Sequence, residues 1–386
     1  MVAAEVINNV IAQGYRLATH SWEYGAFAEA LLEWYDPGAS VFGGNSAFPG
    51  GGVPVLRVSS TEALTYTRPL IWTNGTTLID ADGSAGDAAA LGVPAILIGQ
   101  TEPAYLAAAG RQVRHLLDAV PRWPNGAISH RETVAELWAD FVYMAPPTLA
   151  YWAVQTRDPD LLAAAVEQCL LYGDVLGVGR STAAGEGRDA AGGNATDGLW
   201  RHIVGPQSED LGLWSTGNAW AAAGMSRVLA TAAGSGLGLG GGAAAADDLL
   251  LRRLRDSIRG ILDAAMRLDA AEPGEPLLRN YLDDATWFGE LAGTTLLAAT
   301  AYRMARLAPA EFGARYVRWA DAKRRAAEAR VDARGLLAPV VNPLDWRDRT
   351  PRSESPEAQS FAVLMFAAHR DYLAATATGA DGDVSD

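Results

Sequence analysis

The most informative stretch of this sequence runs from Gly126 to Ala153 and reads GAISHRETVAELWADFVYMAPPTLAYWA. Its apolar spacing is helical, and it places Asp140 between Trp138 and Tyr143, after His130. A carboxylic acid packed among aromatic side chains can keep a proton available near neutral pH, which makes Asp140 a candidate general acid. The structural alternative is that Asp140 caps a helix and that Trp138 belongs to the core.

Size and composition indicate one large folded unit. The chain has 386 residues, 49% of them hydrophobic, and no obvious linker separates two cores; helical toroids and α/β barrels reach this length as one unit. The net charge of −14 repels nucleic acid and long polyanions, so an acidic substrate would be small. No uninterrupted apolar run of about 18 residues is present, which excludes a membrane-spanning helix. With one cysteine and no His/Cys cluster, the sequence predicts neither a metal site nor a cofactor.

Helical spacing recurs along the whole chain, and strand signals are few. The expected helices cover about residues 2–19, 22–35, 86–99, 102–119, 131–156, 158–176, 217–233, 247–267, 285–308, 310–330 and 355–375. Short strands are expected at 53–60 and 77–81, and a flexible connection at the Gly-rich segment 234–246. The pattern predicts an all-α toroid of helical hairpins over residues 1–375, followed by a disordered acidic tail at 376–386.

A second acidic residue stands where a Gly-rich loop becomes a helix. In SAGDAAALGVPAILIG, from Ser84 to Gly99, that residue is Asp87. The structural interpretation is a helix N-cap. On the residues alone this interpretation is preferred, and a place in the site follows only from the resemblance described below.

Aromatic residues and a histidine gather in GLWRHIVGPQSEDLGLWSTGNAWAAAGMSRVL, from Gly198 to Leu229. His202 by itself would commonly be a surface histidine. Trp214 and Trp220 fit either a wide toroid core or a cleft in which an indole stacks on the apolar face of a sugar. On the residues alone, both interpretations stay open.

In order and spacing, these segments resemble the unsaturated uronyl hydrolases of glycoside hydrolase families 88 and 105. The resemblance rests on a Trp-x-Asp followed by a Tyr-Met-Ala-Pro run, and on the Gly-Leu-Trp…His and Trp-x-x-Gly-Asn-x-Trp blocks. It implies a single-domain α/α toroid of six helical hairpins. It assigns the general acid to Asp140, and it matches Asp87 to a second essential Asp at an earlier helix start.

The resemblance also implies a set of substrate-binding residues. They are His130, Arg131, Trp138, Tyr143, His202, Trp214, Thr216 and Trp220. At position 216 the sequence departs from the family, where an Arg often helps to hold the substrate carboxylate. Thr216 offers only a hydroxyl, so Arg131 or Arg201 is expected to supply the cation.

Two later segments support the same resemblance. They are DDATWFGELAGTTLLAATAYRMA, from Asp283 to Ala305, and SESPEAQSFAVLMFAA, from Ser353 to Ala368. In the second, Glu357 and Gln359 are expected to be structural. Near the start of the chain, Trp22 is expected to be a packing residue.

The resemblance implies an enzyme that removes a 4,5-unsaturated uronic acid from the non-reducing end of a small oligosaccharide by hydrating the C4=C5 bond. Two alternatives stay open: an inverting exo-glycosidase acting on saturated uronides, and a carbohydrate-binding toroid without activity. The N-terminus lacks the pattern of a signal peptide, so a cytoplasmic location is expected. The aglycone, the linkage and the oligomeric state are not indicated.

Overall fold

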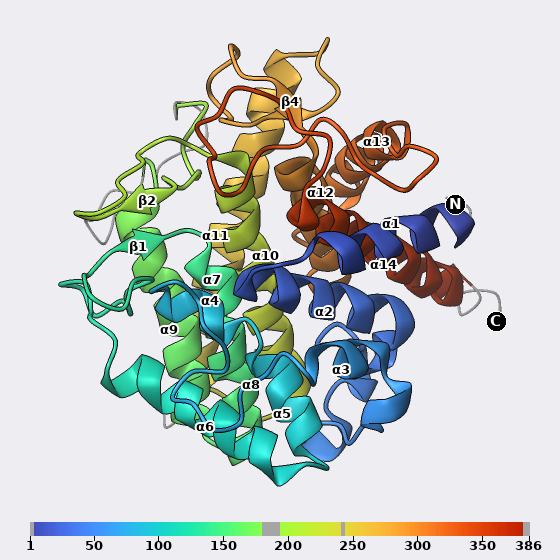
Figure 1. Ribbon diagram of the computed structural model, residues 1–386. Coiled ribbons are helices and arrows are strands. Elements are labelled where there is room, and N and C mark those ends of the chain that lie inside the picture. Colours follow the sequence, from blue (N-terminus) through green and yellow to red (C-terminus); the bar gives the residue numbers. More distant parts are fainter. Residues whose placement is uncertain (1–3, 180–193, 241–243, 381–386) are drawn as a thin grey trace.

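Helices make up most of the computed structural model, which describes residues 4–179, 194–240 and 244–380 (Figure 1). The α-helices are α1 (Ala4–Leu17), α2 (Ser21–Tyr35), α3 (Glu62–Thr67), α4 (Ala85–Ala89), α5 (Gly92–Gly99), α6 (Pro103–Asp118), α7 (Phe141–Met144), α8 (Pro146–Thr156), α9 (Pro159–Leu176), α10 (Ser215–Ser235), α11 (Ala244–Ala271), α12 (Leu291–Leu307), α13 (Ala314–Glu328) and α14 (Pro356–Ala380). Short 3-10 turns lie at Pro37–Ala39, Gly44–Ser46, Pro49–Gly51 and Val58–Ser60. Two antiparallel ribbons pair β1 (Leu137–Trp138) with β2 (Ile203–Val204) and β3 (Leu278–Arg279) with β4 (Gly289–Glu290).

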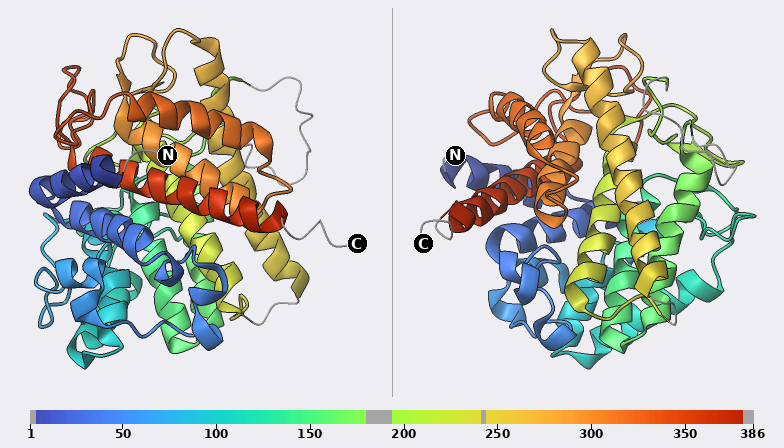
Figure 2. Two further views of the ribbon diagram at one scale, coloured as in Figure 1. Left: turned by 90° about the vertical axis from the view of Figure 1, so that its right-hand side faces the viewer. Right: turned by 180° about the vertical axis from the view of Figure 1, so that it is seen from behind.

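The helices form a closed double ring. Helices α2, α5, α8, α10, α12 and α14 form the inner ring, and α14 returns to contact α2. Each inner helix packs against an outer partner, in the order α3, α6, α9, α11, α13 and α1. From behind, α9 and α11 lie side by side on the outside (Figure 2). The predicted all-α toroid of six hairpins is therefore confirmed.

Burial explains which helices are inner and which are outer. Helix α10 is buried over almost its whole length, as expected for a helix with apolar or small residues on all sides. Helix α1 instead buries a single stripe formed by Ile7, Val10, Ile11 and Gly14. That spacing of three and four residues marks one apolar face, and the opposite face meets solvent.

The structure corrects several expected boundaries. The helix expected at 131–156 is helical only from Phe141, because residues 131–140 form bends and strand β1. The helix expected at 86–99 is divided into α4 and α5. The strands expected at 53–60 and 77–81 are wrong: the first segment ends in a 3-10 turn, and the second is a series of bends.

Two expectations fall partly outside the described residues. In the Gly-rich connection, α10 extends to Ser235 and α11 begins at Ala244, while 241–243 lie outside the description. Helix α14 continues to Ala380, beyond the expected start of the tail, and 381–386 are not described. Across the described residues, none of the helices combines the length and apolar character that crossing a membrane requires.

Candidate active site

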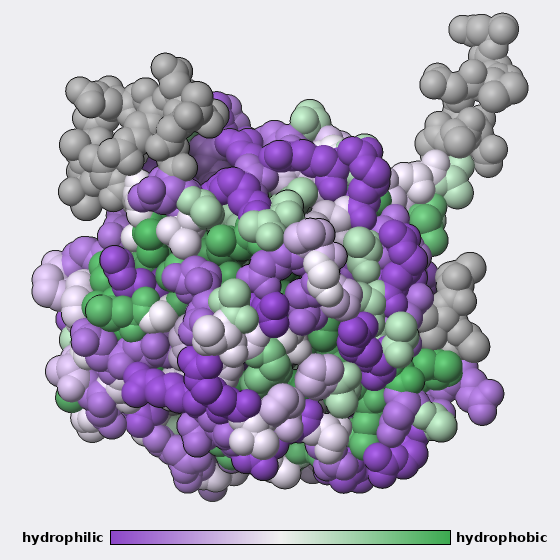
Figure 3. All heavy atoms as spheres, turned by 90° about the horizontal axis from the view of Figure 1, so that it is seen from above, coloured by the Kyte–Doolittle hydropathy of each residue, from purple (hydrophilic) through white to green (hydrophobic). Residues whose placement is uncertain are grey.

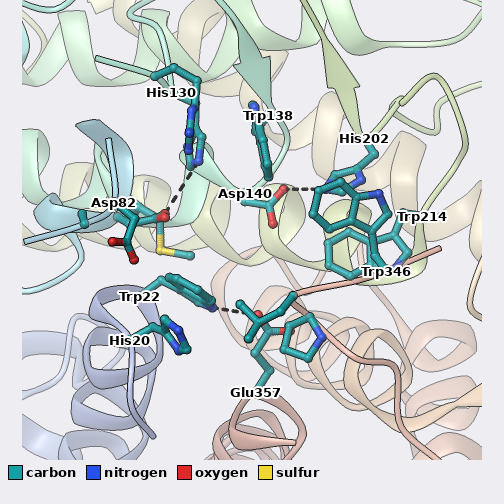
Figure 4. A pocket seen from close by; sticks show the side chains of 16 residues that line it. His20, Trp22, Asp82, His130, Trp138, Asp140, His202, Trp214, Trp346 and Glu357 are labelled. Atoms are coloured by element: carbon teal, nitrogen blue, oxygen red, sulfur yellow. Dashed lines mark hydrogen bonds and ion pairs between the residues drawn. The ribbon is translucent and has the colours of Figure 1, made fainter. Parts of the chain in front are cut away.

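A cavity of about 270 Å³ opens where the amino ends of several inner helices meet. It is lined by His20, Trp22, Ala81, Asp82, Asp87, His130, Arg131, Trp138, Asp140, Met144, His202, Trp214, Pro343, Leu344, Trp346 and Glu357 (Figure 4). The predicted residues Asp87, Asp140, His130, Arg131, Trp138, His202 and Trp214 are therefore brought to one place. Residues separated by more than three hundred positions in the sequence share this wall.

The ring geometry explains why these side chains converge. Asp140 and Trp214 are the N-cap residues of α7 and α10. Asp87 and Glu357 lie in the first turns of α4 and α14. Several helix amino ends thus face one space, and their partial positive charge favours an anionic ligand there.

Asp140 and His202 are held together by the first ribbon. Trp138 of β1 pairs with Ile203 of β2, and the amide of Ala139 donates to the carbonyl of His202 at 2.9 Å. The next side chain along, Asp140, reaches His202, with 3.4 Å between Oδ2 and Nε2. A backbone pairing between segments that are distant in the chain, with Trp138 opposite Ile203, therefore sets the position of the proposed acid.

The other nitrogen of His202 is held by a carboxylate that the sequence analysis did not identify. Nδ1 of His202 lies 3.0 Å from Oδ2 of Asp210, and Oδ2 also accepts from the Tyr281 hydroxyl at 2.5 Å. Although burial opposes the charged ring, Asp140 and Asp210 raise the pKa of His202 above its usual value. The result is a row of acid, imidazole and acid that ends at the cavity.

Asp87 lies beside a second imidazole. Ser84, not Asp87, caps α4: its Oγ accepts from the amide of Asp87 at 3.0 Å. The N-cap interpretation of Asp87 is thus wrong, and its carboxyl is left to face the cavity. Burial and the nearby charge of Asp140 raise the pKa of Asp87 to about 7, so this carboxyl carries a proton for much of the time near neutral pH.

His130 is buried between the indole of Trp138, which stacks on it at a centroid distance of 4.7 Å, and Asp87. Its Nε2 lies 3.9 Å from Oδ1 of Asp87 and 3.2 Å from the Ser84 hydroxyl. Burial lowers the pKa of His130 to about 3. It is therefore neutral under ordinary conditions and can donate or accept a hydrogen bond without adding charge.

Arg131 supplies the permanent positive charge among the lining residues named above. Its guanidinium carbon lies 5.9 Å from the centre of the Trp138 ring. Across the described ranges, no ion pair or side-chain hydrogen bond engages its guanidinium, which leaves the donors free for a ligand. Arg201, the other candidate, does not line the cavity.

The structure does not bring three of the predicted substrate-binding residues to the cavity. Tyr143 and Trp220 pack against each other in the core, with ring centroids 4.5 Å apart. Tyr143 also lies under the guanidinium of Arg227. Thr216 is fully buried in the first turn of α10. Their types fitted the resemblance, but their helical positions direct them into the protein interior.

The cavity also contains residues that were expected to be structural. Trp22 donates from Nε1 to Oε1 of Glu357 at 2.9 Å, and both side chains line the cavity. Gln359, by contrast, is structural as expected, because its amide bonds to the backbone of Leu337, Val10 and Gly335. Residues two positions apart on a helix point to different faces. The spacing therefore could have indicated that Glu357 and Gln359 have different surroundings.

Trp346 is another residue that the sequence analysis missed. It lies in the loop between α13 and α14 and packs edge-on against Trp138 and His202, with ring centroids 5.4 and 4.9 Å away. An aromatic residue in a loop rich in Asp, Pro and Arg was its only sequence signal. Within the described segments, no group of three His, Cys, Asp or Glu side chains is arranged to hold a metal ion.

Comparison with known proteins gives the family. The model of Glycosyl Hydrolase Family 88 matches residues 7–233, which is more than half of the chain. No curated protein matches the sequence.

The fold is shared with several solved structures. A possible member of the GH105 family from Klebsiella pneumoniae is 18% identical, with a TM-score of 0.69 over 95% of this chain and 92% of that one. A possible GH105 member from Salmonella enterica is 17% identical, with a TM-score of 0.68 over 96% of both chains. An unsaturated glucuronyl hydrolase specific for heparin is 10% identical, with a TM-score of 0.60 over 96% of both. With its family match and this fold, the chain belongs to glycosyl hydrolase family 88 and is a glycoside hydrolase.

Proposed function

We propose that the enzyme removes a 4,5-unsaturated uronic acid from the non-reducing end of small oligosaccharides produced by polysaccharide lyases. The observation that carries this proposal is the Asp140 carboxyl, whose buried Oδ2 lies beside His202 in a cavity that also holds Asp87. A volume of about 270 Å³ suits a terminal sugar rather than a long chain.

Protonation begins the proposed reaction. The C4=C5 bond is conjugated with the ring oxygen as an enol ether, so protonation at C4 creates positive character at C5 and on that oxygen. Asp140 delivers this proton, and His202, held by Asp210, stabilises the carboxylate that forms. General acid assistance of this kind contributes roughly 10²–10⁴-fold to the rate.

Water then completes the conversion. Its oxygen bonds to C5 while Asp140 takes up one of its protons, which restores the acid, and Asp87 and His202 direct the water. The hemiketal at C5 opens by breaking the bond from C5 to the ring oxygen, which leaves a C5 ketone and a hemiacetal at C1. Breaking the bond from C1 to the aglycone oxygen releases the aglycone as an alcohol, with one water consumed overall.

The substrate carboxylate is assigned to Arg131 and to the helix amino ends. Arg131 has free guanidinium donors at the cavity, whereas Thr216 is buried in α10. Charge-assisted hydrogen bonds from guanidinium to carboxylate are the stronger kind. They would offset the negative charges of Asp82, Asp87 and Asp140 around the same cavity.

A panel of lyase-generated unsaturated disaccharides tests the proposal. Turnover should abolish the ultraviolet absorbance of the conjugated C4=C5 bond and release the aglycone in equal amount. The panel should vary the second sugar among rhamnose, glucose, galactose and amino sugars. Absence of turnover on every member, with a folded enzyme, would disprove the assignment.

A second candidate is an inverting hydrolase of saturated uronides. It is favoured by Asp87, whose pKa of about 7 makes it a second possible acid in the same cavity. Such an enzyme would use one carboxyl as acid and the other as base, with water between them. Release of the aglycone from a saturated glucuronide or galacturonide, without activity on unsaturated disaccharides, would favour this reaction.

A further inference from the structure

Glu357 is a buried acid of the cavity to which the proposed reaction assigns no part. It lies in the first turn of α14 and is 2% exposed. Trp22 donates to its Oε1, while Oε2 is buried without a hydrogen-bond partner in the described part of the chain. Figure 4 shows this pair across the cavity from His130, Trp138 and His202, with the carboxyl of Asp140 pointing into the space between.

The surroundings of Glu357 disfavour its charged form. Burial is the main cause, and the charges of Asp140, Glu23 and Glu290 add to it. Together they raise the pKa of Glu357 well above its usual value. The basic residue His20 lines the same cavity, stacks on Trp22 and pairs with Glu23.

A buried carboxyl that stays protonated carries an O–H donor. Oε1 is already occupied by the indole N–H of Trp22, which makes it the acceptor oxygen, so the proton belongs on Oε2. A neutral acid held in an apolar site can donate a hydrogen bond to a substrate oxygen without repelling a negative charge. A buried donor without a partner costs free energy, and a bound ligand would recover it.

We propose that Glu357 is a substrate-binding residue that donates a hydrogen bond from its neutral carboxyl to an oxygen of the uronyl residue. This inference rests on the proposed function, because it takes a uronyl sugar as the ligand. Trp22 holds the carboxyl in place and presents its indole to the same space. With Thr216 buried, the site thus binds the acidic sugar through one cation, Arg131, and one neutral donor, Glu357 of α14.

Two substitutions separate a neutral donor from a charged group. Glu357→Gln keeps an acceptor for Trp22 and replaces the O–H by an amide N–H. We expect it to keep KM for the best disaccharide of the panel within about 3-fold of wild type. Glu357→Ala removes the donor and should raise KM by about 10-fold or more, with a smaller change in kcat.

The pH dependence gives a readout that a purely structural role would not change. Wild-type KM should rise at alkaline pH as Glu357 loses its proton, and Glu357→Gln should lack this rise. Glu354→Gln is a matched control on the neighbouring segment, because Glu354 is exposed and pairs with Arg16 outside the cavity. If Glu357→Ala does not fold, Glu357→Met fills the same volume without a donor and takes its place.

The outcomes distinguish this inference from the proposed function. If the wild type cleaves an unsaturated disaccharide but Glu357→Gln is as impaired in KM as Glu357→Ala, the inference fails and the function stands. An unchanged KM in a folded Glu357→Ala enzyme overturns it equally. If the wild type cleaves no member of the panel, calorimetric titration with glucuronate and galacturonate replaces KM, and wild type that binds neither overturns both proposals.

Discussion

At the scale of single residues, the carboxyls of Asp87 and Asp210 differ in how firmly they hold a proton. Burial and the charge of Asp140 raise the pKa of Asp87 to about 7. Asp210 behaves oppositely: although burial opposes ionisation, hydrogen bonds from His202 and Tyr281 hold its pKa below the usual value. A permanent carboxylate, an imidazole and a proposed acid thus form one row, while Asp87 titrates near neutrality.

Substituting the two aspartates separates their roles. Asp140→Asn should lower kcat by at least about 10²-fold with the fold intact, because the amide cannot deliver a proton. Asp87→Asn should cost less, because an amide can replace a protonated carboxyl as a hydrogen-bond donor. Turnover of an unsaturated disaccharide and thermal melting are the measurements. Near wild-type kcat in a folded Asp140→Asn enzyme would remove Asp140 as the donor.

Asp210 should act on the reaction through His202. Asp210→Asn removes the carboxylate that favours the imidazolium, so the pKa of His202 should fall toward its usual value. Less imidazolium then remains at any given pH, and the alkaline limb of the kcat profile should move to lower pH. Tyr281→Phe is the control, since it removes one hydrogen bond to Asp210 and keeps the charge. An unshifted profile in Asp210→Asn would show that the charge of His202 does not stabilise the carboxylate that Asp140 forms.

The carboxylate contact can be tested with two arginines. Arg131 lines the cavity with free donors, whereas Arg201 does not line it. Losing a charged hydrogen bond to the substrate costs roughly 1.5–3 kcal/mol, so Arg131→Ala should lose about 10–150-fold in kcat/KM. Arg201→Ala should stay close to wild type. The uronyl substrate should be compared with its C6 amide, and an unchanged preference for the acid in Arg131→Ala would place the donors elsewhere.

At the scale of elements, helical periodicity predicted most of the inner and outer helices. It could not predict that residues 131–140 leave the helix, because that region is held by pairing of β1 with β2, a segment far along the chain. The amides of Gln207 and Ser208 complete this arrangement by donating to the buried carboxylate of Glu136. Long-range contacts of this kind leave no local pattern in a sequence.

The residues of the site divide in the same way, into those that a local sequence pattern indicates and those that depend on distant contacts. Asp87, Asp140 and His202 could be identified because each stands in a segment that resembles the family. Asp210 and Trp346 could not, since their roles depend on the contacts of a loop with a distant helix end. Tyr143 and Trp220 had suitable residue types, but their positions on α7 and α10 turn them inward.

Close packing of α10 against α7 should position the acid. A Cβ at Gly224 would lie 2.2 Å from the backbone oxygen of Val142, in the helix that Asp140 caps. Backbone cannot yield as a side chain can, so Gly224→Ala should cost about 1–3 kcal/mol in the free energy of unfolding and lower kcat as well. Gly274→Ala, with nothing within 4 Å of its Cβ, is the control. Unchanged melting and kcat in Gly224→Ala would show that α7 is free to shift.

At the scale of the whole molecule, the two ends of the helical ring differ in what they contain. The cavity occupies the amino ends of the inner helices, while buried ion pairs lie toward the carboxyl ends. Arg227 of α10 pairs with Glu29 and Glu33 of α2, and Arg303 of α12 pairs with Glu33 and with Asp371 of α14. Removing one partner of a buried pair is costly, because the other charge stays buried. These contacts join helices from both ends of the sequence and hold the side of the ring away from the cavity together.

The charge of the whole molecule should set the preferred length of the substrate. The chain carries a net charge of −14, and hydrophilic residues cover most of the face drawn in Figure 3. A long acidic oligosaccharide extends beyond the cavity and meets this field, whereas a disaccharide is largely contained near Arg131 and the helix amino ends. At low salt, kcat/KM should therefore be higher for an unsaturated disaccharide than for the corresponding hexasaccharide. The Debye length shortens from about 30 Å at 0.01 M to about 8 Å at 0.15 M. Added salt should therefore reduce the difference in kcat/KM between the two substrates, mainly by raising kcat/KM for the hexasaccharide.

The measurement is kcat/KM for both substrates over this range of salt concentration. A saturated hexasaccharide added as a competitor at each salt concentration controls for binding of the chain outside the cavity. Faster turnover of the hexasaccharide at low salt would contradict the prediction, because it would require a cationic surface that guides the chain toward the site.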